Sequence, residues 1–173
     1  MRNAKANYLG IAVSIATFAS LFLPWWSIRA SGVSIDIYPV GVRALSVPTY
    51  DADWVVDRLL ALNIAILTVG LLVAVSGVLA AAGSLKLPAL LVAPAVLNFA
   101  AAFLFYNLMW SAIGKLAHGP FSGTNLIPVG PWGFDLGIGL CVLAGLVSPI
   151  PLILLYWKRH KQPEEAGNSH SRR

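Results

Sequence analysis

The sequence contains few charged residues, one cysteine and three histidines, and each scarcity excludes a class of protein. Only 11% of its 173 residues are charged and 58% are hydrophobic, whereas soluble domains carry roughly 25% charged residues, so a soluble globular fold is excluded. Because Cys141 is the only cysteine, the chain cannot form an intrachain disulfide. The histidines are far apart in the sequence, and we expect no metal site, no haem site and no cofactor.

The charged residues leave four uncharged runs, each long enough to cross a membrane. The runs contain 23, 27, 28 and 22 residues, and they are Ala6–Ile28, Leu59–Leu85, Leu87–Gly114 and Leu136–Trp157. About 20 apolar helical residues cross a hydrocarbon core of roughly 30 Å. We therefore expect an all-α integral membrane protein with a four-helix transmembrane bundle in residues 1–157. The expected spans are about 8–25, 57–83, 88–110 and 134–157, the outer loops are 26–52 and 111–131, and a disordered basic cytoplasmic tail covers 158–173.

The distribution of basic residues predicts the orientation of the bundle. If both termini are cytoplasmic, eight lysines and arginines lie inside and four lie outside, which follows the positive-inside rule. The outer four are Arg29, Arg43, Arg58 and Lys115. The first apolar run resembles a secretory signal, but no small-residue cleavage site follows it. We therefore expect the run to remain as the first span of a multi-pass protein in the cell membrane.

The first outer loop contains a hairpin pattern. Apolar residues alternate with polar ones on both sides of Ser31-Gly32, which is typical of two strands joined by a two-residue turn. This register places Trp26 opposite Ile37 and predicts a diagonal pair between Arg29 and Asp36. Residues 40–45 could add a third strand. One face of such a sheet is apolar and needs a cover, which could be the bilayer surface, the second outer loop or another protein.

Small residues recur at helical spacing and are the strongest interaction signal in the sequence. Such residues let helix backbones approach closely where lipid provides no hydrophobic drive. They predict packing within one bundle or, alternatively, a face for a partner subunit. The residues concerned are Gly133, Gly137 and Gly145 in the fourth span and Gly70, Ala74 and Gly77 in the second.

The interior of the spans contains one notable polar residue and no charged one. Asn98 lies near the middle of the third span, where an amide needs a partner. We expect an interhelical hydrogen bond there, with substrate binding as the alternative. The absence of ionisable residues at mid-depth argues against ion-coupled work in the bilayer. Asp135 is expected near the outer boundary, in contact with water.

The predicted span order resembles the claudin type of architecture, with four spans, internal termini and a longer β-rich first outer loop that begins at Trp25-Trp26. The resemblance is one of topology, because the paired cysteines of the claudin first loop are missing, and no paracellular function follows from it.

The sequence predicts a non-catalytic accessory or scaffolding subunit of a membrane complex. We expect its partners to be the lipid bilayer and a protein subunit or a second copy of the chain, with no nucleic acid. The outer-loop residues expected to interact are Trp25, Trp26, Arg29, Asp36 and Trp54. The alternative is a small channel or carrier for neutral or apolar solutes that uses Asn98.

Overall fold

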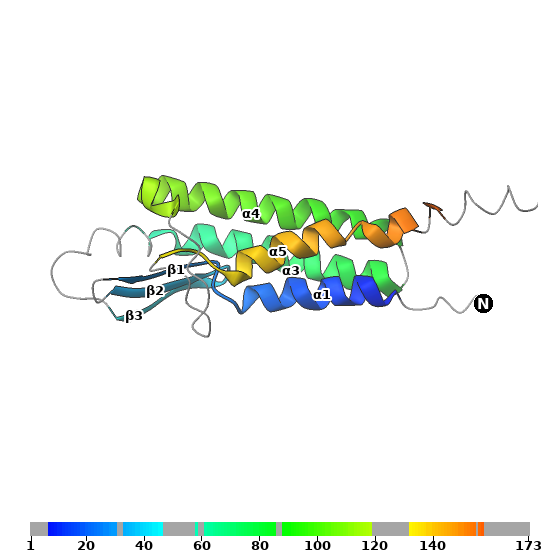
Figure 1. Ribbon diagram of the computed structural model, residues 1–173, viewed down its shortest axis with the longest axis horizontal. Helices are drawn as coiled ribbons and strands as arrows, with labels where there is room; N and C mark the ends of the chain where they lie inside the picture. Colours follow the sequence, from blue (N-terminus) through cyan, green and yellow to red (C-terminus); the bar gives the residue numbers. More distant parts are fainter. Residues whose placement is uncertain are drawn as a thin grey trace, which may run out of the picture.

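The computed structural model describes residues 7–30, 33–46, 58, 61–85, 88–118, 132–154 and 156–157. It is mostly helical, with one small antiparallel sheet (Figure 1). In chain order the elements are α1 (Tyr8–Leu21), β1 (Trp26–Ala30), β2 (Val33–Tyr38), β3 (Gly41–Ser46), α3 (Asn63–Leu85), η1 (Pro88–Leu91), α4 (Val92–Ile113), η2 (Gly114–His118), β4 (Trp132–Phe134) and α5 (Leu136–Val147). Trp54 and the tail 158–173 lie outside the described residues.

Within the described residues, three helices are long and apolar enough to cross a membrane, namely Asn63–Leu85, Ala89–Ile113 and Leu136–Leu154. This supports the prediction of a multi-pass membrane protein. The first predicted span is shorter than expected, because α1 contains 14 residues and ends at Leu21. A helix of that length rises only about 21 Å. The chain then leaves the helical path before Pro24, which restricts the residue before it to extended conformations.

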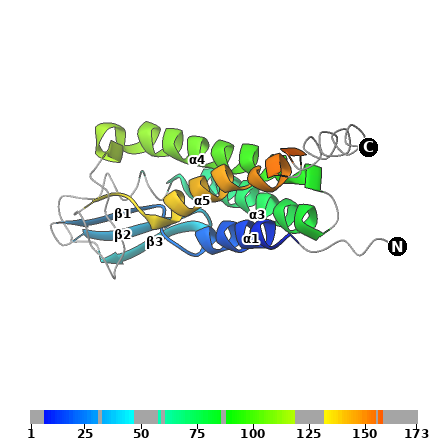
Figure 2. The ribbon, with the colours of Figure 1, turned by 45° about the vertical axis from the view of Figure 1, so that its right-hand side comes forward.

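The helices α1, α3, α4 and α5 lie along the long axis of the molecule, and the sheet lies at one end of them (Figure 1). We call this the sheet end. α1 begins and α5 finishes at the opposite end (Figure 2). α1 packs against both α3 and α5, and α4 packs against α3 and α5. The helices are also tied together at the end opposite the sheet, where Asn7 N donates to Ser84 O at 3.1 Å and Ser148 Oγ donates to Leu91 O.

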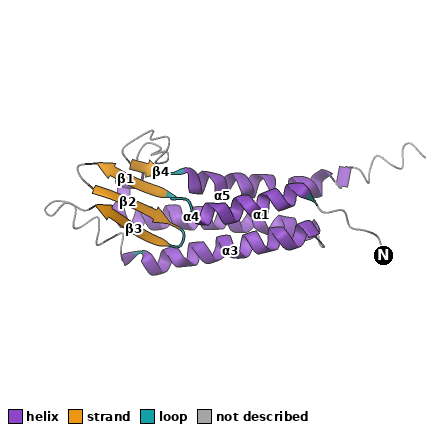
Figure 3. Ribbon diagram, turned by 90° about the horizontal axis from the view of Figure 1, so that it is seen from below, coloured by secondary structure: helices purple, strands orange, loops and turns teal. Residues whose placement is uncertain are grey.

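The sheet has the strand order β3-β2-β1-β4, and all its pairs are antiparallel (Figure 3). The predicted hairpin register is confirmed, because Trp26 pairs with Ile37, Ile28 with Ile35 and Ala30 with Val33. The third strand is also confirmed, as Gly41–Ser46. The fourth strand, β4, was not predicted. It comes from the residues before α5 and pairs with β1.

The apolar face of the sheet is covered by the protein itself. Trp26, Ile35 and Ile37 are almost completely buried in one core cluster with Phe105 and Met109 of α4. The same cluster continues through Ile113 to Ala117 of η2. Of the three covers that the sequence left open, the structure has the first residues of the second outer loop, and α4, which was not among them, provides most of the cover.

The sheet is joined to the helices through close backbone contacts. A Cβ atom added at Gly137 of α5 would lie 2.6 Å from Pro24 O and 2.7 Å from Leu23 O, so only glycine fits there. Gly70 of α3 similarly lies against the carbonyl of Pro39, in the turn between β2 and β3. At the start of α3, Asn63 Oδ1 accepts a hydrogen bond from Val42 N at 3.2 Å. These contacts fix the orientation of the sheet on the bundle.

Replacing Gly137 by alanine is expected to destabilise the protein, because the new methyl group would lie 2.5 Å from Trp25 Cδ1. Overpacking of this kind costs about 1–3 kcal/mol. Gly139→Ala is the matched control, since a Cβ there meets no atom within 4 Å. Thermal unfolding of both variants in detergent, followed by tryptophan fluorescence, measures the difference. Equal stabilities would contradict the close contact at Gly137.

Candidate functional site

The polar face of the sheet contains the charged side chains that the structure places together. Arg29 Nη2 and Asp36 Oδ1 form an ion pair at 2.6 Å, which confirms the predicted diagonal pair. The Asp36 side chain is 2% exposed and the Arg29 side chain 26% exposed. Arg43 pairs with Asp36 in the strand register, and its side chain is exposed. The expectation that Asp36 is available to a partner is therefore wrong, because Asp36 is buried against Arg29.

Asp135 is buried at the junction between β4 and α5, so the expectation that it contacts water is wrong. One carboxylate oxygen accepts a hydrogen bond from Leu136 N at 2.7 Å and caps α5. The other accepts one from Ser27 Oγ at 2.8 Å, which connects the cap to β1. A carboxylate at the N-terminus of a helix also interacts favourably with the helix dipole. Asp135 is therefore a structural link between sheet and bundle.

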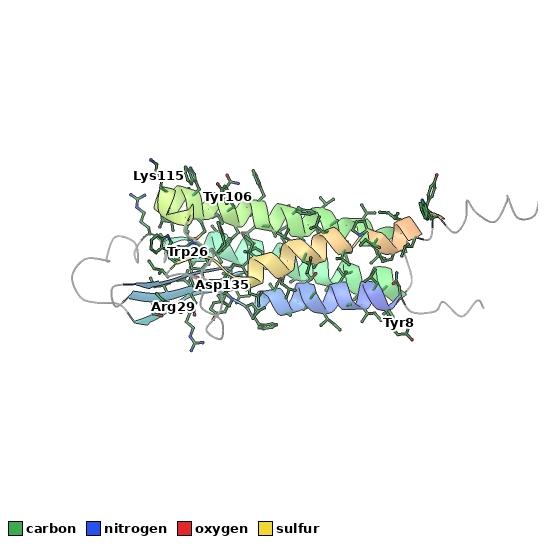
Figure 4. The ribbon with its side chains drawn as sticks, viewed as in Figure 1. Tyr8, Trp26, Arg29, Tyr106, Lys115 and Asp135 are labelled. Carbon is green, nitrogen blue, oxygen red and sulfur yellow. The ribbon has the colours of Figure 1, made fainter. Side chains whose placement is uncertain are left out.

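Trp25 and Trp26 are core residues, which corrects the expectation that they form an outer-loop interaction surface. Trp25 is 0% and Trp26 1% exposed. Trp25 Nε1 donates to Ser20 O at 2.9 Å, and its ring meets Phe105 edge-on at a centroid distance of 5.2 Å. Figure 4 shows Trp26 and Asp135 where the sheet meets the helices. The indole rings of Trp25 and Trp26 therefore pack between the sheet and the helices.

Asn98 is one of several buried polar residues between the helices. Its Nδ2 donates to Thr17 Oγ1 of α1 at 3.3 Å, which confirms the predicted interhelical hydrogen bond. Its backbone carbonyl accepts a contact from Cys141 Sγ at 3.8 Å. A second buried hydrogen bond joins α1 to α3, where Ser14 Oγ donates to Gly77 O at 2.9 Å. Transport by way of Asn98 stays a prediction.

The small residues of the sequence serve different purposes. Gly77 packs against the Phe18 ring of α1, and Gly145 packs against Asn98 Cβ of α4, so both are at helix–helix contacts. Gly70 instead meets the turn between β2 and β3, and Gly137 meets the segment that connects α1 to β1. Ala74 is partly buried beside the core cluster. Gly133 corrects the prediction of a helical stripe, since it lies in strand β4 with φ 136°.

Two parts of this arrangement were missed from the sequence. Ser27 was not predicted as the partner of Asp135, and Thr17 was not predicted as the partner of Asn98. An aspartate directly before an apolar helix is a signal for an N-cap, and that signal identifies Asp135. Among the described residues, no three histidine, cysteine or acidic side chains are grouped so that they could hold a metal ion.

Comparison of the chain with protein-family models, with curated proteins and with solved structures finds no match. The claudin-like arrangement therefore stays a prediction.

Replacing Arg29 by glutamine should destabilise the protein, because it leaves the Asp36 carboxylate buried without its partner. Removing one partner of a buried pair costs about 3–5 kcal/mol, and the partial exposure of Arg29 reduces the expected loss to about 1–3 kcal/mol. Asp36→Asn added to Arg29→Gln should restore most of the stability, since the amide is neutral. Unfolding of the two single variants and the double variant gives the coupling energy. A coupling of zero would show that the pair does not stabilise the sheet.

Proposed function

We propose that the protein is a non-catalytic, four-span scaffold of the cell membrane that holds its sheet in a fixed orientation for a protein partner. The observation that carries the proposal is the junction between sheet and bundle. Trp25 N donates to Ile37 O at 2.7 Å, Asp135 N donates to Trp25 O at 2.9 Å, and Gly137 N donates to Pro24 O at 2.9 Å. A sheet attached in this way moves with the bundle, as a presented surface requires.

The proposal treats α1 as a membrane span, in addition to the three longer helices, despite its length of 14 residues. α1 packs against α3 near both ends, because Gly10 meets Ser84 and Phe18 meets Gly77. The first turn of α1 therefore lies beside the last turn of α3, and the later part of α1 reaches the second half of α3. A bilayer can thin around a short apolar segment at a cost of fractions of a kcal/mol per Å.

The apolar surface of α4 supports a thin membrane-embedded region. Its most exposed large apolar side chain is Phe103, which is 71% exposed, and beyond it only Trp110, a residue type enriched at membrane boundaries, is exposed, at 44%. One turn beyond Phe103, Asn107 is exposed, and Ser111 follows on the next turn. Beyond Phe103 the buried side chains Phe105 and Met109 pack in the cluster that covers the sheet. The outer part of α4 thus belongs to the sheet layer, and the embedded part of α4 is short, as α1 is.

The inside of the bundle supports a packing role for the helices. Buried serines, threonine and asparagine lie between them, whereas large apolar side chains such as Leu71 and Leu146 are 64% and 57% exposed. This distribution suits helices surrounded by lipid, whose contacts depend on small residues and hydrogen bonds. The proposed orientation, with both termini cytoplasmic and the sheet outside, rests on the eight-to-four distribution of basic residues.

The experiment uses single cysteines and a membrane-impermeant maleimide with a photoreactive group, applied to intact cells. Ser34 in β2 and Lys115 in η2 lie at the sheet end, and Asn7 lies at the opposite end. Cys141 is buried, so the unmodified protein should not react. We expect labelling at positions 34 and 115 without permeabilisation, labelling at position 7 only after it, and covalent capture of one partner species from the sheet end.

Two outcomes would contradict the proposal. Labelling of position 7 and position 34 from the same side would show that α1 does not cross the membrane between them. Labelling at positions 34 and 115 with no captured protein, and a solitary monomer on native mass spectrometry, would show that the sheet is not presented to a partner.

A further inference from the structure

A groove lies where the end of α1 meets the turn between β2 and β3. It has a volume of about 380 Å³ and is lined by Leu21 and Phe22 from α1 and its C-cap, and by residues 38 and 40–43 from the strands. Binding pockets for small molecules occupy roughly 300–1,000 Å³, so the groove is large enough for the headgroup region of a lipid. No residue of the groove belongs to the junction contacts at Pro24, Trp25 or Gly137.

One side of the groove is apolar and exposed. Phe22 is 76% exposed and Val40 53% exposed. Leu21 and Val42 extend this surface inward. Exposed apolar side chains at the end of an apolar helix suit contact with acyl chains near the boundary of the membrane. This step rests on the proposed function, because it requires α1 to be a span.

The other side of the groove carries a cation and a hydroxyl group. Arg43 is exposed, and it forms no ion pair within the described part of the chain, since the neighbouring Asp36 is paired with Arg29. Tyr38 lies diagonally from Arg43 on the same face of the sheet. Burial, with the nearby charge of Asp36, raises the pKa of Tyr38, so its hydroxyl group remains protonated and can donate a hydrogen bond.

We propose that this groove binds the headgroup of an anionic glycerophospholipid, with Arg43 and Tyr38 contacting the phosphate and Phe22 and Val40 contacting the upper acyl chain. Guanidinium groups bind phosphate through directed, charge-assisted hydrogen bonds. Basic pockets between transmembrane helices bind anionic headgroups at the cytoplasmic face of membranes, and Arg43 offers the same charge interaction at the sheet end. A free phosphate would use Arg43 but not the apolar side, so the combination favours the lipid.

The test uses the purified full-length protein in mild detergent with phosphatidylglycerol, phosphatidylcholine or glycerol phosphate added. Lipid retention is measured by native mass spectrometry, and thermal stability in parallel. We expect phosphatidylglycerol to be retained about fivefold better than phosphatidylcholine, the difference that one basic residue near a membrane surface provides. Arg43→Gln should remove this preference, and Arg43→Lys should keep part of it. Lys115→Gln is the matched control, because it removes an exposed cation from η2 outside the groove.

Each other result overturns the inference. Equal retention of the two lipids by the unmodified protein, or an unchanged preference in Arg43→Gln, would show that the groove does not select an anionic lipid. Glycerol phosphate that competes as well as the intact lipid would identify a site for a soluble anion. Val40→Ser provides a second variant without a charge change, and it should weaken retention of phosphatidylglycerol while the protein stays folded. The measurement needs no partner protein, so a failed capture experiment in cells would leave its result unchanged.

Discussion

The structure depends on how the backbone groups are satisfied where the chain leaves α1 and enters β1. Buried N–H and C=O groups without partners are costly, and close to lipid no water replaces the missing bond. Here Pro24 O accepts from Gly137 N, while Trp25 donates to β2 and accepts from the residue before α5. The β2 strand and the residues around the start of α5 therefore provide the hydrogen-bond partners for the backbone groups of Pro24 and Trp25.

This requirement explains several other features. Gly137 has to be glycine because the carbonyl groups of Leu23 and Pro24 occupy the space of a side chain. β4 adds to the sheet directly before α5, which places Asp135 where it can cap the helix and accept from Ser27. The Trp25 ring fills the remaining space between the connection and Phe105 of α4. Sheet and helices are therefore parts of one packed unit.

The features that could be predicted from the sequence have local causes. The hairpin register follows from strict alternation around Ser31-Gly32, and the long apolar helices follow from the uncharged runs. β4 could not be predicted, because three residues are too few to show a period and their partner strand is about 100 residues away. Trp25 and Trp26 were expected to interact with a partner from the outer loop, but packing against α4 buries both. The groove beside Arg43 likewise depends on a tertiary contact between α1 and the β2–β3 turn.

The most direct test of the account is a distance distribution between the sheet and the bundle. Spin labels at Ser34 of β2 and Val78 of α3 report on the junction, and labels at Val78 and Val96 of α4 provide a control within the bundle. Pulsed electron paramagnetic resonance of the protein in lipid nanodiscs measures both pairs. We expect a single narrow distribution for Ser34 and Val78, as narrow as the control. A broad distribution for that pair beside a narrow control would show that the sheet moves independently, and it would contradict a scaffold that presents the sheet in one orientation.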